Sequence, residues 1–419
     1  MTNGVLEVTI IKKNVFFIIV FIKNDMIFSS KLANELFRAF YIDRWNERVR
    51  PMAFTEMDKH SHKLVLAYCI GKYEEMNGNK IDWNCILKDA VFEFLRRIAT
   101  SDIKSPIFQK IKNNKDVFNK LNEYVFSKYE DIIEDADLKK EFYFFLFEEC
   151  DRNKLEYRIT DAAHIYSSFW EFNIVKQFNP FTHQNEKVEH EIRNNLDAYS
   201  DLKGINNLLN NHSISNFIDL CGQLRFQIRW SQTPRLPKTS VLGHTMLVAT
   251  ISYFISLDLN VCEKRLFNNF FGGLFHDLPE AVTRDIISPV KRSSDKLDNL
   301  ISELEIKLAE AEIYPHIEKE WIGEIKYFSQ NEFYNKAMIE NEIKIIDSTE
   351  EMNAKYNENK FCPYDGKIVK FADQYSTYME AKKSIETGIT SPDLEKAVKQ
   401  ITKTYINTTF DYLDMKDLF

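Results

Sequence analysis

Blocks of sequence in the first half of the chain return, in the same order, in the second half. The pairs are residues 99–107 with 282–290, Arg44-Trp45 with Arg229-Trp230, residues 62–67 with 244–249, and residues 166–171 with 375–380. The first three pairs lie 182 to 185 residues apart, and the fourth lies 209 apart. Such self-similarity predicts two copies of one structural unit. The wider last spacing predicts 26 additional residues in the second copy, which we place in the charged stretch 293–330.

Apolar residues recur at intervals of three and four along both halves, as they do in amphipathic helices. The pattern predicts helices over residues 31–42, 59–73, 86–99, 141–149, 241–255, 264–275, 302–312 and 393–405. Only 11 glycines and 10 prolines occur among 419 residues, too few for a turn-rich β architecture. We therefore expect an all-α fold of two tandem helical bundles, packed against each other as a pseudodimer.

The repeat divides the chain into four segments. We expect an N-terminal extension over residues 1–30, a first helical domain over 31–175, a polar connection with some helix over 176–211, and a second domain over 212–419. An apolar run at residues 15–22 follows Lys12-Lys13, but a bilayer span takes about 20 residues. No small-residue cleavage site follows the run, so a short strand or an extension is expected rather than a membrane anchor.

Composition limits the possible binding partners and the cellular compartment of the protein. A net charge of −8 provides no basic field for a nucleic acid polymer, although it is compatible with a local basic pocket for one phosphate. The six cysteines lie far apart without paired spacing, which predicts neither a disulfide framework nor a thiolate zinc site. The protein is therefore expected in the reducing cytoplasm, without a membrane or nucleic acid partner. The cysteines are Cys69, Cys85, Cys150, Cys221, Cys262 and Cys362.

Chemistry-bearing side chains gather in the second half. The adjacent pair His276-Asp277 is followed closely by Glu280, Asp285 and Lys291. His244 lies upstream in an apolar helical stretch, and Asp373 lies downstream in an apolar setting. Two imidazoles and two carboxylates form a nitrogen and oxygen shell for one divalent ion and leave positions open for water and substrate. Asp347 is an alternative fourth ligand, but the repeat favours Asp373.

This ordered set resembles the HD-domain phosphohydrolases, whose metal is held by a His, an adjacent His-Asp pair and a distant Asp on separate helices. With Arg229-Trp230 before the first His and Ser-Pro-Val-Lys ending at Lys291, it is most similar to the 5′-deoxynucleotidase branch. The resemblance covers roughly residues 222–390. Two positions depart from it, since Gly243 stands where the family has Glu and Arg284 where it has Gly.

The resemblance implies a role for each residue. His244, His276, Asp277 and Asp373 would hold the metal, whose identity stays open among Mn, Co, Fe, Ni, Mg and Zn. Glu280 would position or deprotonate the attacking water, and Asp285 would protonate the leaving ribose oxygen. Arg229 and Lys291 would bind the phosphate, while Trp230 would pack on the sugar and exclude a 2′-hydroxyl. The plainer alternatives are solvated carboxylates, surface charges and a core tryptophan.

The first copy lacks most of these predicted ligand and catalytic residues. Glu93-Phe94 replaces the His-Asp pair, Arg97 the catalytic Glu, and His164 the last Asp. We interpret it as a degenerate structural copy, with a different metal site of His62, Glu93 and His164 as the alternative.

The function expected from these observations is a metal-dependent release of phosphate from a (deoxy)nucleoside 5′-monophosphate, by a monomeric intramolecular pseudodimer with one ion per chain. One alternative is a triphosphohydrolase or another small phosphate-ester hydrolase. The other is a catalytically silent module that senses a nucleotide.

Overall fold

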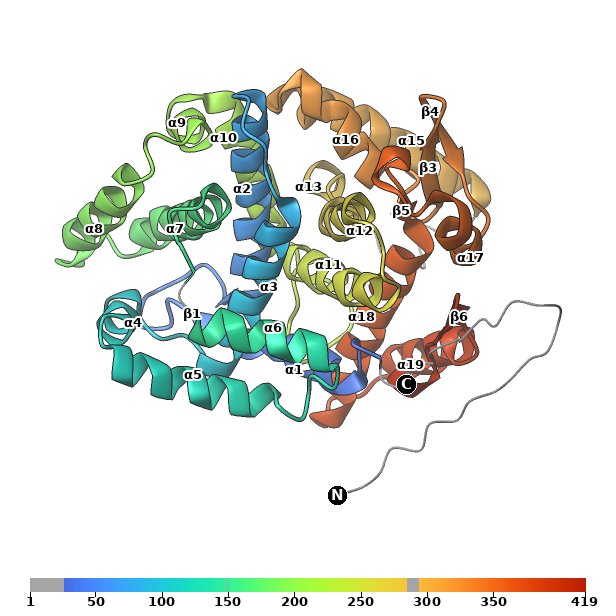
Figure 1. Ribbon diagram of the computed structural model, residues 1–419, viewed down its shortest axis with the longest axis horizontal. Helices are drawn as coiled ribbons and strands as arrows, with labels where there is room; N and C mark the ends of the chain where they lie inside the picture. Colours follow the sequence, from blue (N-terminus) through green and yellow to red (C-terminus); the bar gives the residue numbers. More distant parts are fainter. Residues whose placement is uncertain (1–25, 149, 285–293) are drawn as a thin grey trace, which may run out of the picture.

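The computed structural model describes residues 26–148, 150–284 and 294–419 (Figure 1). Helices dominate these residues, so the predicted all-α fold is confirmed. The strands of the described part form only three small antiparallel sheets, β1-β2, β4-β3-β5 and β6-β7.

The first half begins with a short helix and a strand pair, after which helices follow one another closely. Its elements are α1 (Ser30–Phe37), β1 (Asp43–Arg44), β2 (Phe54–Thr55), α2 (Glu56–Met76), α3 (Trp83–Thr100), α4 (Ser105–Lys112), α5 (Lys115–Tyr129), α6 (Ala136–Phe147) and α7 (Leu155–Phe178). Helices α8 (Asn185–Asp197) and α9 (Lys203–Asn210) follow, within the stretch predicted as a polar connection.

The second half contains further helices and two of the small sheets of the described part. Its elements are α10 (His212–Gln223), α11 (Val241–Asp258), α12 (Glu263–Phe275), α13 (Glu280–Thr283), α15 (Asp295–Glu312), α16 (Lys319–Ser329), β3 (Asn335–Ile339), β4 (Glu342–Ile345), α17 (Thr349–Glu351), β5 (Tyr364–Asp365), α18 (Gly366–Glu386), α19 (Pro392–Tyr405), β6 (Thr409–Phe410) and β7 (Leu413–Asp414).

Two sets of three helices make similar contacts, one set in each half. Helix α2 contacts α3 and α7, and α11 contacts α12 and α18. In the view of Figure 1, α7 to α9 lie on one side of α2, while α12, α16 and α18 lie on the other side with β3 to β5. Helix α2 also packs directly on α11, so the two halves meet along these central helices.

The place of the additional residues differs from our prediction. Helices α5 and α6 correspond in length and spacing to α15 and α16, so the stretch 293–330 has a counterpart in the first half. Between α16 and α18, however, lie the β4-β3-β5 sheet and α17, whereas only a short connection joins α6 to α7. The insertion therefore falls after residue 330, where the helical periodicity ends.

One hydrophobic core joins the two halves. Tyr68 of α2 packs on Phe271 of α12 with ring centroids 5.0 Å apart, and Trp83 of α3 lies 5.1 Å from Phe267. Helix α11 is the one described helix long and apolar enough to cross a membrane, and 94% of it is buried inside the protein. All six cysteines are free in the structure.

The N-terminal extension is described only from Met26 onward, and the apolar run at residues 15–22 lies outside the described residues. The backbone N–H groups of Ile27 and Phe28 donate to the Asp258 carboxylate at 2.7 and 3.0 Å. The start of the first half is therefore fixed to the C-terminal end of α11.

Candidate metal centre

Three helices and one turn bring the predicted ligands together. His244 lies in the first turn of α11, which Ser240 caps by accepting a hydrogen bond from the backbone N–H of Gly243. His276 caps the C-terminus of α12, Asp277 follows it in the turn before α13, and Asp373 lies in the second turn of α18. The α11–α12 and α11–α18 contacts thus bring together residues that are far apart in sequence.

The ligand atoms of these residues converge on one point. Nε2 of His244 lies 3.0 Å from Oδ1 of Asp373 and 3.7 Å from Oδ2 of Asp277, and Nε2 of His276 lies 3.2 Å from the same Oδ2. Ligand atoms of His244, His276 and Asp277 all lie within 4.8 Å of one another, the one such group in the part of the chain that the structure describes. Asp373 contacts this group through His244.

Both imidazoles are oriented through their other nitrogen. His276 Nδ1 lies 2.8 Å from the carbonyl oxygen of Gly273, which can only accept, so Nδ1 carries a proton and Nε2 is the nitrogen that faces Asp277. His244 Nδ1 lies 2.9 Å from Oγ of Ser376, one turn beyond Asp373. Both Nε2 atoms are buried and make no hydrogen bond of acceptable geometry within the described residues, despite their short distances to carboxylate oxygens. Metal-binding histidines are held in this way.

The electrostatics of the site favour a cation. Burial alone would raise the pKa of the Asp277 carboxyl, but His276, His244 and Arg229 keep it well below its usual range. Burial would lower the pKa of His276, yet Asp277 and Asp373 raise it to about 9. The pKa of His244, in contrast, is lowered by its burial and by Arg229. The potential near His276 therefore attracts positive charge, and the donor set fits a divalent ion of the borderline class.

The predicted phosphate and sugar contacts lie beside this group. Arg229 Nη1 is 3.9 Å from Oδ2 of Asp277, and its guanidinium also reaches Thr377 and Glu380. Trp230 Nε1 donates to the Glu380 carboxylate at 2.7 Å. Trp230 is partly exposed and has a φ of +59°, so it is not a simple core tryptophan.

Glu380 holds both Arg229 and Trp230, and residue-by-residue reasoning from the sequence missed it. It is fully buried, and Arg229 with Arg235 lowers the pKa of its carboxyl to about 2 against the effect of burial. The sequence contained a signal for Glu380, because the similar blocks 166–171 and 375–380 both end in Glu.

The remaining predicted residues are placed only in part. Glu280 begins α13 one turn after Asp277, is 7% exposed, and its carbonyl oxygen accepts a hydrogen bond from Gln227. Asp285 and Lys291 lie outside the described residues. Asp347 is exposed on the loop after β4 and does not join the group.

Both departures from the family pattern have a local explanation. A Cβ at Gly243 would lie 2.6 Å from the ring of Phe40 and 3.1 Å from the Asp58 carboxylate, so the first half occupies the space of the family's Glu. Arg284 has φ +66° and ψ 161°, a backbone conformation that favours glycine. The family's Gly is thus explained by backbone geometry, and Arg284 takes that geometry at a conformational cost.

The first half contains a matching arrangement around Glu171. Its carboxylate accepts hydrogen bonds from Arg44 Nε at 3.1 Å and Trp45 Nε1 at 2.9 Å, as Glu380 does from Arg229 and Trp230. Trp45 and Trp230 also share a positive φ, of 53° and 59°.

The histidine correspondence was wrong by three residues. Thr55 caps α2 as Ser240 caps α11, so Lys59, and not His62, occupies the position of His244. His62 Nε2 instead donates to the carbonyl oxygen of Ile218 at 3.1 Å, and the ring packs on Trp170. His62, Glu93 and His164 do not form a ligand group within the described residues, so the alternative metal site is not supported.

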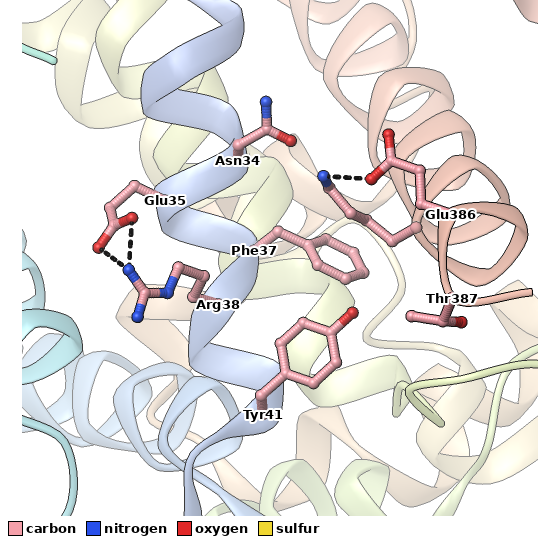
Figure 2. Close-up of a pocket in the computed structure, with 8 residues that line it drawn as sticks. Asn34, Glu35, Phe37, Arg38, Tyr41, Glu386 and Thr387 are labelled. Carbon is pink, nitrogen blue, oxygen red and sulfur yellow. Dashed lines mark hydrogen bonds and ion pairs between the residues drawn. The ribbon is translucent and has the colours of Figure 1, made fainter.

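A separate hollow lies between α1 and the C-terminal end of α18 (Figure 2). Phe37 and Tyr41 line it, together with the ion pairs Glu35–Arg38 and Lys383–Glu386. It contains none of the predicted site residues, and its charges are already paired.

Comparison with known proteins agrees with this geometry. Residues 221–402 match the sequence model of the family described as HD domain. The chain is similar to the 4′-phosphooxetanocin A phosphatase of Priestia megaterium, with 32% identity over 84 residues, which are 19% of this chain and 43% of that protein. The match therefore spans less than half of the relative's length. No solved structure matches the chain significantly.

Proposed function

Because the C-terminal half of the chain contains an HD domain, we propose that the protein releases phosphate from a (deoxy)nucleoside 5′-monophosphate with the help of one divalent ion. The observation that carries the proposal is the convergence of His244, His276, Asp277 and Asp373, with both Nε2 atoms buried and the Nδ1 atoms held by protein groups. The similarity to a named phosphatase supports hydrolysis of a phosphate ester in general.

The bound ion would lower the pKa of a water molecule and polarise the phosphorus centre. The protein residues provide binding and proton transfer. Arg229 is held between Asp277 and Glu380, so its guanidinium is presented to a phosphate oxygen at the edge of the ligand group. Glu280, one turn after Asp277, would accept the proton of the attacking water. Asp285 would protonate the leaving oxygen, and Lys291 would add a second positive charge.

Sugar selection is assigned to Trp230. Its Nε1–H is bonded to Glu380 beside the Arg229 guanidinium, so the phosphate contact and the indole ring are oriented by one carboxylate. A ring fixed in this way can pack on the sugar of a nucleotide whose phosphate lies on Arg229. We assign to it the exclusion of a 2′-hydroxyl, which makes the deoxyribonucleotide the preferred substrate.

We further propose that the first half is a degenerate copy of the same unit and acts as its intramolecular partner. The matched α2–α3–α7 and α11–α12–α18 contacts, the paired Arg-Trp-Glu arrangements and the shared core support this. Each half covers apolar surface that the other would otherwise expose to water. The intact chain should therefore be a monomer with a single catalytic site.

A product assay tests the proposal. The purified chain is incubated with nucleoside mono-, di- and triphosphates and each of several divalent ions, and orthophosphate, nucleoside and tripolyphosphate are measured. Nucleoside plus orthophosphate from monophosphates alone is expected, with no product in EDTA or in the Asp277→Asn variant. Tripolyphosphate would replace the monophosphate assignment with a triphosphohydrolase. Absence of any product with every ion would favour the silent sensing module.

A further inference from the structure

Two lysines are buried on one face of α2. Lys59 and Lys63 are one helical turn apart, and their exposed fractions are 1% and 2%. Side chains four residues apart on a helix are neighbours, so two ammonium groups here would repel each other. Burial of an ammonium group is costly unless an anion accompanies it.

The protein itself supplies no carboxylate contact to either lysine within the described residues. Lys59 Nζ contacts two neutral groups, Oγ of Ser168 at 2.6 Å and Nε2 of His164 at 3.3 Å. Lys63 Nζ has neither a hydrogen bond nor an ion pair in the described part of the chain.

The nearby carboxylates are occupied by other cations. Glu56 is paired with Arg44 at 2.7 Å and with Arg97 at 3.3 Å. Glu171 is paired with Arg44 at 3.1 Å and with Arg225 at 2.9 Å, and Glu93 with Arg96. Each of these carboxylates therefore has an arginine partner, and neither lysine has a carboxylate within ion-pair distance in the described residues.

The lysines and their neighbours differ in charge from the residues at the matching positions of the candidate metal centre. Lys59 stands at the position of His244, and Lys63 at that of Val248, which is a buried apolar residue. The matched carboxylates Asp277, Glu280 and Asp373 are replaced by Phe94, Arg97 and His164, while Glu93 replaces His276. These positions of the first half therefore carry one carboxylate instead of three, together with the cationic side chains Lys59 and Arg97.

The lysines lie beside partly exposed side chains. Those of Glu93 and Asp102 are 16% and 21% exposed, so solvent reaches the edge of this buried face. The pKa of His164 is lowered well below its usual value by burial and then by Lys59, Lys63, Arg97 and Arg44, so four cations act on one ring.

From this placement of charges we propose that the first half binds the phosphate group of a small molecule between Lys59, Lys63, Arg97 and His164, without a metal ion. Burial lowers the pKa of Lys59 well below its usual value, and a phosphate oxyanion would favour the charged form of this lysine. It would also pair with Lys63 and accept hydrogen bonds from His164 and Arg97. The site is separate from the metal centre, and only its correspondence to that centre rests on the proposed second copy.

The test measures phosphate binding where the metal centre cannot contribute. Inorganic phosphate is titrated calorimetrically into the full-length Asp277→Asn protein in EDTA. The same titration is repeated with two double variants, in which Lys63→Val or Lys59→Met is combined with Asp277→Asn. Lys63→Val installs the residue type of the matched position in the second half, so folding should be preserved, and circular dichroism checks it. Lys72→Met, on the same helix but paired with Glu75 at 2.8 Å, is the matched control.

We expect one phosphate per chain, at least tenfold weaker binding in both lysine variants, and unchanged binding in Lys72→Met. Phosphate should raise the melting temperature of the parent protein and not that of Lys63→Val, since a ligand stabilises only the state that binds it. A nucleoside monophosphate that displaces phosphate with higher affinity would identify a nucleotide as the source of the group, and failure to compete would identify free phosphate. No saturable binding, or equal binding in both lysine variants, would overturn the proposal. Loss of hydrolysis in the product assay would leave this result unaffected.

Discussion

At the residue scale, Glu380 determines how two predicted substrate contacts are presented. It accepts from Trp230 at 2.7 Å and pairs with Arg229 at 3.3 Å, and it makes no contact with the metal ligands His276 and Asp277 within the described residues. It is therefore a positioning residue. Its effect on the reaction should pass through substrate binding rather than through the metal.

We predict that Glu380→Gln raises KM by about 10- to 100-fold, since hydrogen bonds to a charged group contribute about 1.5–3 kcal/mol each. Metal content should not change, because the amide keeps the size of the carboxylate and leaves the ligands in place. Steady-state kinetics with elemental analysis measure both. The control is Glu386→Gln, an exposed carboxylate on the same helix that pairs with Lys383. An unchanged KM together with loss of metal would show that Glu380 supports the metal centre instead.

Glu280 should behave differently from a ligand. We predict that Glu280→Ala retains the metal but lowers kcat by about 10²- to 10⁴-fold, the usual contribution of general acid–base catalysis. Asp347→Ala, on the exposed loop after β4, should leave kcat unchanged. Wild-type turnover of Glu280→Ala would reject the proposed proton transfer.

At the scale of elements, α7 and α18 each place a buried glutamate against an Arg-Trp pair. The pKa of Glu171 is lowered to about 2 by Arg44, Arg225 and Lys59 despite its burial, and that of Glu380 is lowered to about 2 by Arg229 and Arg235. Because both folded-state values lie below the ordinary value of 4.5, the unfolded chain binds more protons between these limits.

We therefore predict that these carboxylates make their full contribution to the free energy of unfolding above about pH 4.5. This free energy should fall as the pH decreases from there towards 2. Each contributes roughly 3 kcal/mol, since one pKa unit corresponds to about 1.4 kcal/mol. Urea unfolding at several pH values between 6 and 3 measures the fall. Glu171→Gln should show a smaller fall, and a pH-independent free energy in the wild type would contradict the assignment.

Helix α11 was predicted from the sequence because it is almost continuously apolar, although it is buried on nearly all sides. Helix α12 was predicted because its apolar residues recur at intervals of three and four. Helices α7 and α18 were not predicted, because they bury polar and apolar residues together, including Ser167 and Glu171 in one and Ser376 and Glu380 in the other. The β4-β3-β5 sheet was missed because its exposed strand β4 has no buried face to give an alternating pattern.

The metal ligands could be proposed from sequence because two of them are adjacent and the others lie in apolar helical segments. The wrong pairing of His62 with His244 has a simple cause. Identical residues suggested the alignment, whereas the position of a side chain on a helix depends on where the helix begins, which Thr55 and Ser240 determine by capping.

At the scale of the whole molecule, the two halves meet through α2 and α11 near both sites. The Asp58 carboxylate accepts from Thr55 Oγ1 at 2.7 Å and from Ser240, so one side chain bridges the N-terminal caps of both helices. Ser61 and Thr245 form a second contact, with 3.2 Å between their hydroxyl oxygens. The first half therefore contacts the helix that carries His244 and supports the candidate metal centre from outside its predicted ligand set.

The most direct test of this account is the metal content per chain, measured by elemental analysis after reconstitution and desalting. We predict one tightly held ion in the wild type, none in Asp277→Asn, and one in His164→Ala, because only the second half holds a ligand group. Light scattering on the same samples should show a monomer of 49.6 kDa. Two ions per wild-type chain with loss of one in His164→Ala, or an undiminished ion in Asp277→Asn, would contradict a single metal centre at His244, His276, Asp277 and Asp373.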